Sequence, residues 1–242
     1  MMHPQELTST LDPSYDLSEA MPAVRRRLTF KDPASAWTHF IATFAAIAGA
    51  AFLLWESWGS GAKFWAFAAY SIGFIGVFLS SSVYHFFDLG ERWNLWLKRL
   101  DHMAIFVMIA GSYIPMLVHF LDGGWRTAML VSVLSIATLG VLFKLFWVNA
   151  PRFLGVGLYL AMGWMVVVAA PALARTLSAD VFFWLAVGGL IYTLGALVYA
   201  FKWPDPWPNA FDHHALWHLF VIGGAAAHFV AMVRVIPMTV PA

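Results

Sequence analysis

The chain alternates between long runs without charge and short polar segments. Seven uncharged runs stand out between consecutive Asp, Glu, Lys and Arg residues: 33–55, 64–87, 102–121, 127–143, 153–174, 181–201 and 213–233. A helix needs roughly 20 apolar residues to cross a bilayer, and the fourth run reaches that length if Lys144 extends toward the membrane surface and the span continues to Trp147. None of the runs alternates as the strands of a membrane barrel do. The pattern predicts an all-α membrane protein, a bundle of seven transmembrane helices.

The segments between the runs are short and rich in Gly, Pro, Asn and Asp, so they leave no room for a second domain. Residues 1–32 are polar, mixed in charge and interrupted by prolines, which predicts a flexible tail ahead of a transmembrane domain over 33–242. Composition agrees, because the chain is 61% hydrophobic and 11% charged, whereas soluble domains have about 25% charged residues. A water-soluble enzyme is excluded.

Charge and cysteine content narrow the chemistry further. The net charge of +1 gives no broad basic surface, so nucleic acid is not expected as a partner. The chain has no cysteine, which excludes disulfides, thiolate nucleophiles and Cys-ligated metals. Any metal would be held by His, carboxylate or water.

Orientation follows from the Lys and Arg residues. With the N-terminus inside, ten lie on the cytoplasmic side and four outside. The four outside are Lys63, Arg126, Arg175 and Arg234. This positive-inside bias predicts a cytoplasmic N-terminus and, after seven spans, a C-terminus outside.

Histidines carry the most specific chemical signal. His214 and His218 are spaced i, i+4 at the start of the last run, so both imidazoles lie on one helix face, a spacing that one metal ion can bridge. His85 lies near the end of the second run, which the topology brings to the same cytoplasmic level. Three imidazoles are therefore expected to meet at one depth. The alternative is a set of interfacial histidines that hydrogen-bond to neighbouring helices.

Two further polar residues are expected to line the same site, Asp101 at the same depth and Ser81 roughly 6 Å deeper. Asp101 opens the third run at the cytoplasmic end, although an Asp at a helix N-terminus also serves as a cap. Ser81 precedes His85 by one helical turn, and its alternative role is close helix packing. His39 begins the first run, where a structural or supporting role is expected. His228 lies roughly 15 Å beyond His218 along the helix and is left unassigned.

These residues stand in motifs that resemble those of the hemolysin III family, the bacterial members of the progestin and adipoQ receptor group. The resemblance covers nearly all of residues 32–236. Its most specific parts are SSVYH at 81–85, RLDH at 99–102, IAGSYIP at 109–115 and HALWHLFV at 214–221. One departure is that Asp32 and Ser35 precede the Thr38-His39 pair, where family members commonly have Glu and Asn. This departure weakens any role for the entrance of the first helix.

The resemblance implies a multi-pass protein of the bacterial inner membrane with Zn²⁺ bound by His85, His214 and His218. It also implies that Asp101 and Ser81 line the site, with Asp101 facing a zinc-bound water. Three neutral His ligands and one open position are typical of catalytic zinc. Because eukaryotic relatives of the family are associated with ceramide hydrolysis, the resemblance favours hydrolysis of an amide or ester in a membrane lipid that enters the bundle.

Other functions stay open at this stage. Zinc could be structural, tying helices together in a receptor-like or scaffolding bundle. A pore-forming cytolysin is less favoured, because no helix carries a polar stripe along its length. A retinal protein is excluded, since the run 213–233 contains no lysine for a Schiff base.

Overall fold

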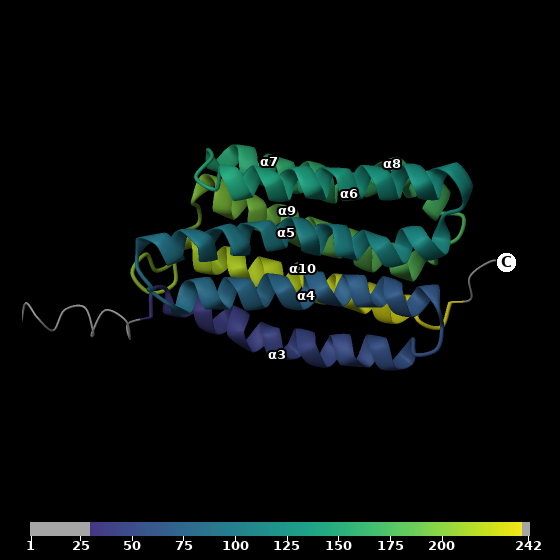
Figure 1. Ribbon diagram of the computed structural model, residues 1–242, viewed down its shortest axis with the longest axis horizontal. Coiled ribbons are helices and arrows are strands. Elements are labelled where there is room, and N and C mark those ends of the chain that lie inside the picture. The colour runs from purple at the N-terminus through teal and green to yellow at the C-terminus, as the bar shows by residue number, and fades with distance from the viewer. Residues whose placement is uncertain (1–29, 239–242) are drawn as a thin grey trace, which may run out of the picture.

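The computed structural model describes residues 30–238, and within them it contains eight α-helices and no sheet (Figure 1). Most of the predicted tail, 1–32, lies outside the described residues. The helices are α3 (Pro33–Glu56), α4 (Ala62–Phe86), α5 (Glu91–Phe120), α6 (Gly123–Phe146), α7 (Arg152–Gly163), α8 (Val166–Leu173), α9 (Ala179–Phe201) and α10 (His213–Val235).

The prediction of seven membrane spans is confirmed. Seven stretches in the described part are long and apolar enough to cross a bilayer, with α7 and α8 together forming the fifth. Large apolar side chains face outward along them, such as Ile41, Ile72 and Leu139. Exposed tryptophans lie near the span ends, including Trp55 and Trp203, as expected at membrane boundaries. The chain is a multi-pass membrane protein.

The spans pack side by side in a closed ring. Each helix contacts its successor from α3 to α7, α9 packs on α7 and α10, and α10 returns to α3. Small residues permit close approach of α4 and α5, because a Cβ on Gly73 would lie only 2.8 Å from the Cα of Met108. The first and last helices are therefore neighbours.

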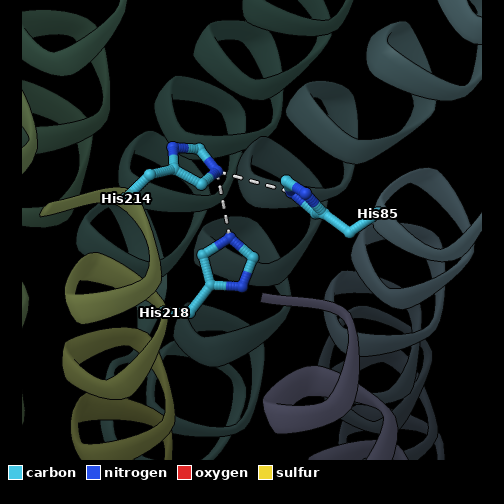
Figure 2. Close-up of side chains that lie close together, drawn as sticks. All are labelled: His85, His214 and His218. Carbon is cyan, nitrogen blue, oxygen red and sulfur yellow. Dashed lines mark hydrogen bonds between the residues drawn. The ribbon is translucent and has the colours of Figure 1, made fainter. Parts of the chain in front are cut away.

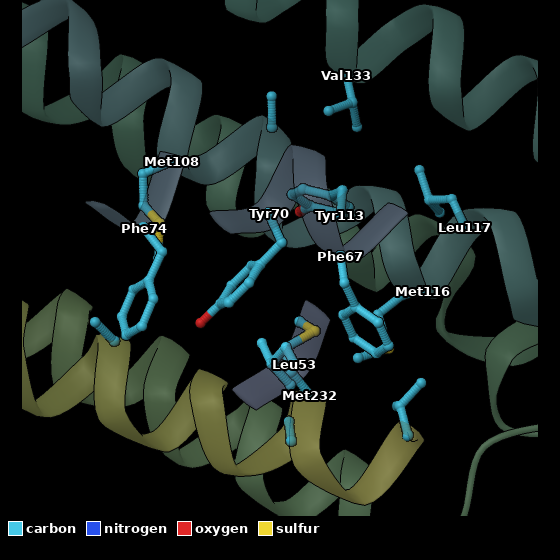
Figure 3. Close-up of a cluster of buried hydrophobic side chains, with 14 of the residues drawn as sticks. Leu53, Phe67, Tyr70, Phe74, Met108, Tyr113, Met116, Leu117, Val133 and Met232 are labelled. Atoms are coloured by element: carbon cyan, nitrogen blue, oxygen red, sulfur yellow. The ribbon is translucent and has the colours of Figure 1, made fainter. Parts of the chain in front are cut away.

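The buried apolar core joins most of the helices (Figure 3). Phe67 and Tyr70 of α4 are fully buried, as are Leu117 of α5, Val133 of α6 and Met232 of α10. This core lies between the ends of the bundle. We use "histidine end" for the end at which α3, α5, α7 and α10 begin and α4, α6 and α9 finish.

The fifth span is interrupted, which the uncharged run did not reveal. Helix α7 ends at Gly163 and α8 begins at Val166. The hydroxyl of Tyr113 on α5 bonds to the backbone on both sides of the break. It donates to the carbonyl oxygens of Met162 and Gly163, at 2.9 Å and 2.6 Å. It also accepts a hydrogen bond from the amide of Val166 at 2.8 Å. Backbone groups freed inside a membrane need such partners, because lipid offers none.

One sequence-based expectation is wrong. Asp101 does not open its helix, because α5 begins ten residues earlier at Glu91. The charged residues before Asp101 lie outside the uncharged run 102–121 but are still helical. The uncharged run therefore covers only part of α5. Asp101 is therefore not an N-cap. The fourth span reaches the expected length, because α6 runs from Gly123 to Phe146 and includes Lys144, which is 4% exposed.

Candidate metal centre

Three imidazoles meet at the histidine end, as the topology argument expected (Figure 2). His85 comes from the last turn of α4, and His214 and His218 come from the first two turns of α10. Their ligand atoms lie within 4.8 Å of one another. The Nε2 atom of His214 is 3.4 Å from Nε2 of His85 and 3.2 Å from Nε2 of His218.

These separations fit a tetrahedral zinc ion. Zn–N bonds of about 2.0–2.1 Å in tetrahedral geometry place two ligand nitrogens roughly 3.3–3.4 Å apart. Hydrogen bonding explains the cluster less well, because a neutral imidazole nitrogen is either a donor or an acceptor. A single Nε2 of His214 therefore cannot form good hydrogen bonds to two other Nε2 atoms that also face each other. Three neutral nitrogens converging on one point are the donor set that a zinc ion uses.

Asp32 contacts Nδ1 of His85, the ring nitrogen that does not face the other two histidines. Its Oδ2 lies 3.3 Å from Nδ1 of His85, an ion-pair distance with poor alignment for a hydrogen bond. Asp32 also caps α3 by accepting from the amide of Ser35 at 3.3 Å, and its own amide donates to the carbonyl of His85 at 3.1 Å. Burial raises the pKa of Asp32, but the contacts with His85 and Ser35 lower it by more, so the pKa lies below its ordinary value. The carboxylate is charged and faces the ring.

Asp32 is not among the site residues that the sequence predicts, because it stands at the end of the polar tail, where no role is expected for the entrance of the first helix. The available signal was an Asp directly before a proline that starts a helix at the histidine end. A carboxylate on the far nitrogen of a ligating imidazole fixes the ring's tautomer and orientation. Asp32 is placed to do this for His85.

His39 lies against the cluster. Its ring stacks on His218 with centroids 3.9 Å apart, and its Nε2 is 3.4 Å from the carbonyl oxygen of His218. His228 lies farther along α10, with Nε2 at 3.3 Å from the carbonyl oxygen of Leu185. His39 therefore contacts the site, whereas His228 does not join the three imidazoles.

Asp101 and Ser81 line a cavity that also reaches His214 and His218. We call this the main cavity; its volume is about 350 Å³. Neither Asp101 nor Ser81 belongs to the group within 4.8 Å, and Oδ2 of Asp101 lies 3.6 Å from Nδ1 of His102. The structure thus brings the three histidines together and sets Asp101 and Ser81 in the wall beside them.

The main cavity continues deep into the bundle. Asp101 and Leu117 both line it, and they are separated by roughly 24 Å along α5. Most of the wall between them is apolar, with residues such as Met108 and Leu160. The cavity therefore joins a polar end at the histidines to a long apolar interior.

Known proteins are similar in sequence to this chain over most of its length. A family model described as Haemolysin-III related matches residues 29–229. The chain is 35% identical to the Hemolysin-3 homolog of Bacillus subtilis (strain 168), over 81% of this chain and 90% of that protein. It is 33% identical to Hemolysin-3 of Bacillus cereus, covering 81% and 87%, and 30% identical to the human Monocyte to macrophage differentiation factor, covering 84% and 83%.

Proposed function

The chain belongs to the Haemolysin-III related family, and on that premise we propose that it is a zinc-dependent hydrolase of an amide or ester bond in a membrane lipid. We place it in the bacterial inner membrane with its histidine end in the cytoplasm. The observation that carries the proposal is the main cavity, which joins two of the three converging histidines and Asp101 to a long apolar interior.

His85, His214 and His218 would hold the ion through neutral imidazole nitrogens. Bound by three such ligands, zinc supplies Lewis acidity and lowers the pKa of a water molecule to about 7. Asp101 is buried in the cavity wall and acts as the general base: a carboxylate oxygen takes a proton from the attacking water. The water oxygen forms a bond to the acyl carbon, the amide or ester bond breaks, and the proton passes to the leaving nitrogen or oxygen.

The apolar interior matches the chemistry of the substrate. The acyl chain of a membrane lipid comes from bilayer hydrocarbon that is as apolar as the cavity wall, so it can occupy this interior without exposing its CH₂ groups to water. The carbonyl that links the chain to its headgroup would then lie at the polar end, close to Asp101 and the histidines. The proposal names the class of bond, an acyl amide or ester, and not one lipid.

A second candidate is a structural zinc in a receptor-like bundle. It is favoured by the positions of the ligands, because α4 packs mainly on α3 and α5, whereas α10 packs mainly on α3 and α9. An ion held by His85, His214 and His218 would add a direct link between two helices that are not each other's main neighbours. This role needs the histidines but not Asp101.

The variant Asp101→Asn separates the two functions. It keeps the shape of the side chain and removes the base, so zinc content and thermal stability should change little. Hydrolysis of lipid substrates, including ceramides and the lipids of the host membrane, should fall by a factor on the order of 10². Products are measured by mass spectrometry of lipids incubated with purified protein.

Asp180→Asn is the matched control, because Asp180 lies at the opposite end of the bundle, where it pairs with Arg234. It should retain full activity. Zinc-loaded protein that turns over no lipid in the panel would refute the hydrolase and leave the structural role. Loss of zinc in Asp101→Asn would contradict the assignment of Asp101 as a base that does not ligate.

A further inference from the structure

A second pocket opens at the histidine end, between α5, α6 and the start of α7. Its volume is about 380 Å³, and it is lined by Lys98, His102, Lys144 and Arg152. We call it the basic pocket. No Asp or Glu is among the described residues that line it. It adjoins the main cavity, with which it shares His102, Val156, Tyr159 and Tyr199.

Lys144 is the most unusual member of the basic pocket. It is 4% exposed, and its Nζ lies against α7 so closely that a Cβ on Gly155 would be 2.8 Å away. Aromatic rings are its close neighbours, with the ring centroids of Phe143 and Tyr159 at 5.3 Å and 5.9 Å from Nζ. Within residues 30–238 the ammonium group has no hydrogen bond or ion pair with the protein. A buried charge is costly unless it is paired. The two rings offset part of that cost through cation–π contacts, and an anion in the basic pocket would complete the pairing.

The other groups of the basic pocket also favour an anion. Lys98 sits at the rim and donates to Oδ1 of Asn149 at 2.8 Å, which holds the loop before α7 in place. Arg152 donates to the carbonyl oxygen of Tyr199 at 3.1 Å, which leaves other N–H groups of the guanidinium for a ligand. Helix α7 begins here, and no side chain caps its first turn. Free amides and the helix dipole add to the positive potential.

We propose that the basic pocket binds a phosphate-type oxyanion, with Lys144 as its principal charge and Lys98 and Arg152 beside it. Lysine binds phosphate as a point charge, and helix N-termini bind phosphate through free amides. The phosphate belongs either to an anionic lipid headgroup or to a free anion in solution. Basic pockets between transmembrane helices at the cytoplasmic side bind anionic headgroups in this way. The site does not depend on zinc or on hydrolysis.

Two arms of one experiment distinguish the sources. Full-length protein purified in a neutral detergent is titrated with inorganic phosphate at constant ionic strength, and binding is followed by calorimetry. The same preparation is mixed with phosphatidic acid or phosphatidylcholine, and retained lipids are counted by native mass spectrometry. Binding in the first arm identifies a free anion. Preferential retention of phosphatidic acid identifies a headgroup.

Lys144→Met and Lys98→Met test the residues. Lys144→Met removes a buried charge, so the variant should fold at least as well as the wild type without phosphate. Its dissociation constant for the bound species should rise about tenfold or more, and that of Lys98→Met should rise less, because Lys98 is only partly buried. Arg92→Met is the control, since Arg92 is exposed on α5 at the same end, outside the basic pocket.

Unchanged binding in Arg92→Met together with weakened binding in the two lysine variants supports the site. Helix content measured by circular dichroism shows whether each variant folds. If Lys144→Met does not fold, the binding measured for Lys98→Met decides the test. Two results overturn the proposal: no binding of either probe to wild-type protein, or equal weakening by the control, which would mean that general surface charge attracts the anion.

Discussion

Asp32 offers the sharpest test of how the histidine cluster is supported. Replacing it by Ser removes the carboxylate that lies 3.3 Å from Nδ1 of His85, because a Ser side chain is too short to reach the ring. Ser is about as good an N-cap as Asp, so α3 should keep its first-turn hydrogen bond to the amide of Ser35. The substitution therefore separates support of the imidazole from stability of the helix.

The magnitude follows from the geometry. Loss of a partner that orients a metal ligand typically weakens metal binding by about 10- to 100-fold. The Asp32 side chain is 32% exposed and poorly aligned with the ring, so solvent screens the contact and the lower figure applies. We expect the zinc dissociation constant to rise about tenfold, or about 1.4 kcal/mol. The free energy of unfolding without metal should change by less than about 0.5 kcal/mol.

Zinc affinity is measured by competition with a chromogenic chelator at fixed pH, and stability by thermal unfolding of metal-free protein. Glu56→Gln is the control, because Glu56 ends the same helix at the opposite end of the bundle. An unchanged zinc affinity in Asp32→Ser would refute the argument that Asp32 supports His85. An equal loss in Glu56→Gln would mean that the effect is one of net charge.

Three further predictions concern the metal, the interrupted span and the topology. Purified protein should contain about one zinc ion per chain, and His85→Ala, His214→Ala and His218→Ala should each lower the zinc content measured by plasma emission spectrometry, whereas His119→Ala, at the opposite end, should not. Tyr113→Phe should lower the free energy of unfolding by about 1–3 kcal/mol, because backbone groups at the break lose their partner; denaturant titration against wild type measures this, and an unchanged midpoint would contradict it. Reporter fusions should place residue 20 in the cytoplasm and residue 242 outside, and a cytoplasmic C-terminus would overturn the assigned orientation.

The spans and the meeting of the three histidines could be predicted because both depend on local rules. Charge is excluded from the membrane interior, so uncharged runs mark the spans. Alternating spans return to the same side, so His85 near the end of one and His214 at the start of another must share a level. The start of α5 was missed because charge limits a span but not a helix, and Glu91 begins a helix outside the uncharged run.

The missed features depend on contacts between residues far apart in the chain. The break at Gly163 is stabilised by Tyr113, fifty residues earlier, and no pattern within the run 153–174 shows that partner. Burial of Lys144 depends on Gly155 in the next helix, which leaves space for the ammonium. The contact between Asp32 and His85 likewise joins two helices. Periodicity and charge describe one helix at a time and do not describe these pairs.

Because α10 closes the ring against α3, the ring is completed only when the last span has been synthesised. Helices α3 and α4 are synthesised early, so His85 is in the membrane before the next four spans are inserted. His214 and His218 arrive only with the last span, so any chain truncated before α10 lacks two of the three imidazoles. The complete cluster of three imidazoles is thus a property of the finished chain, and the zinc that we propose would be bound only at the end of assembly.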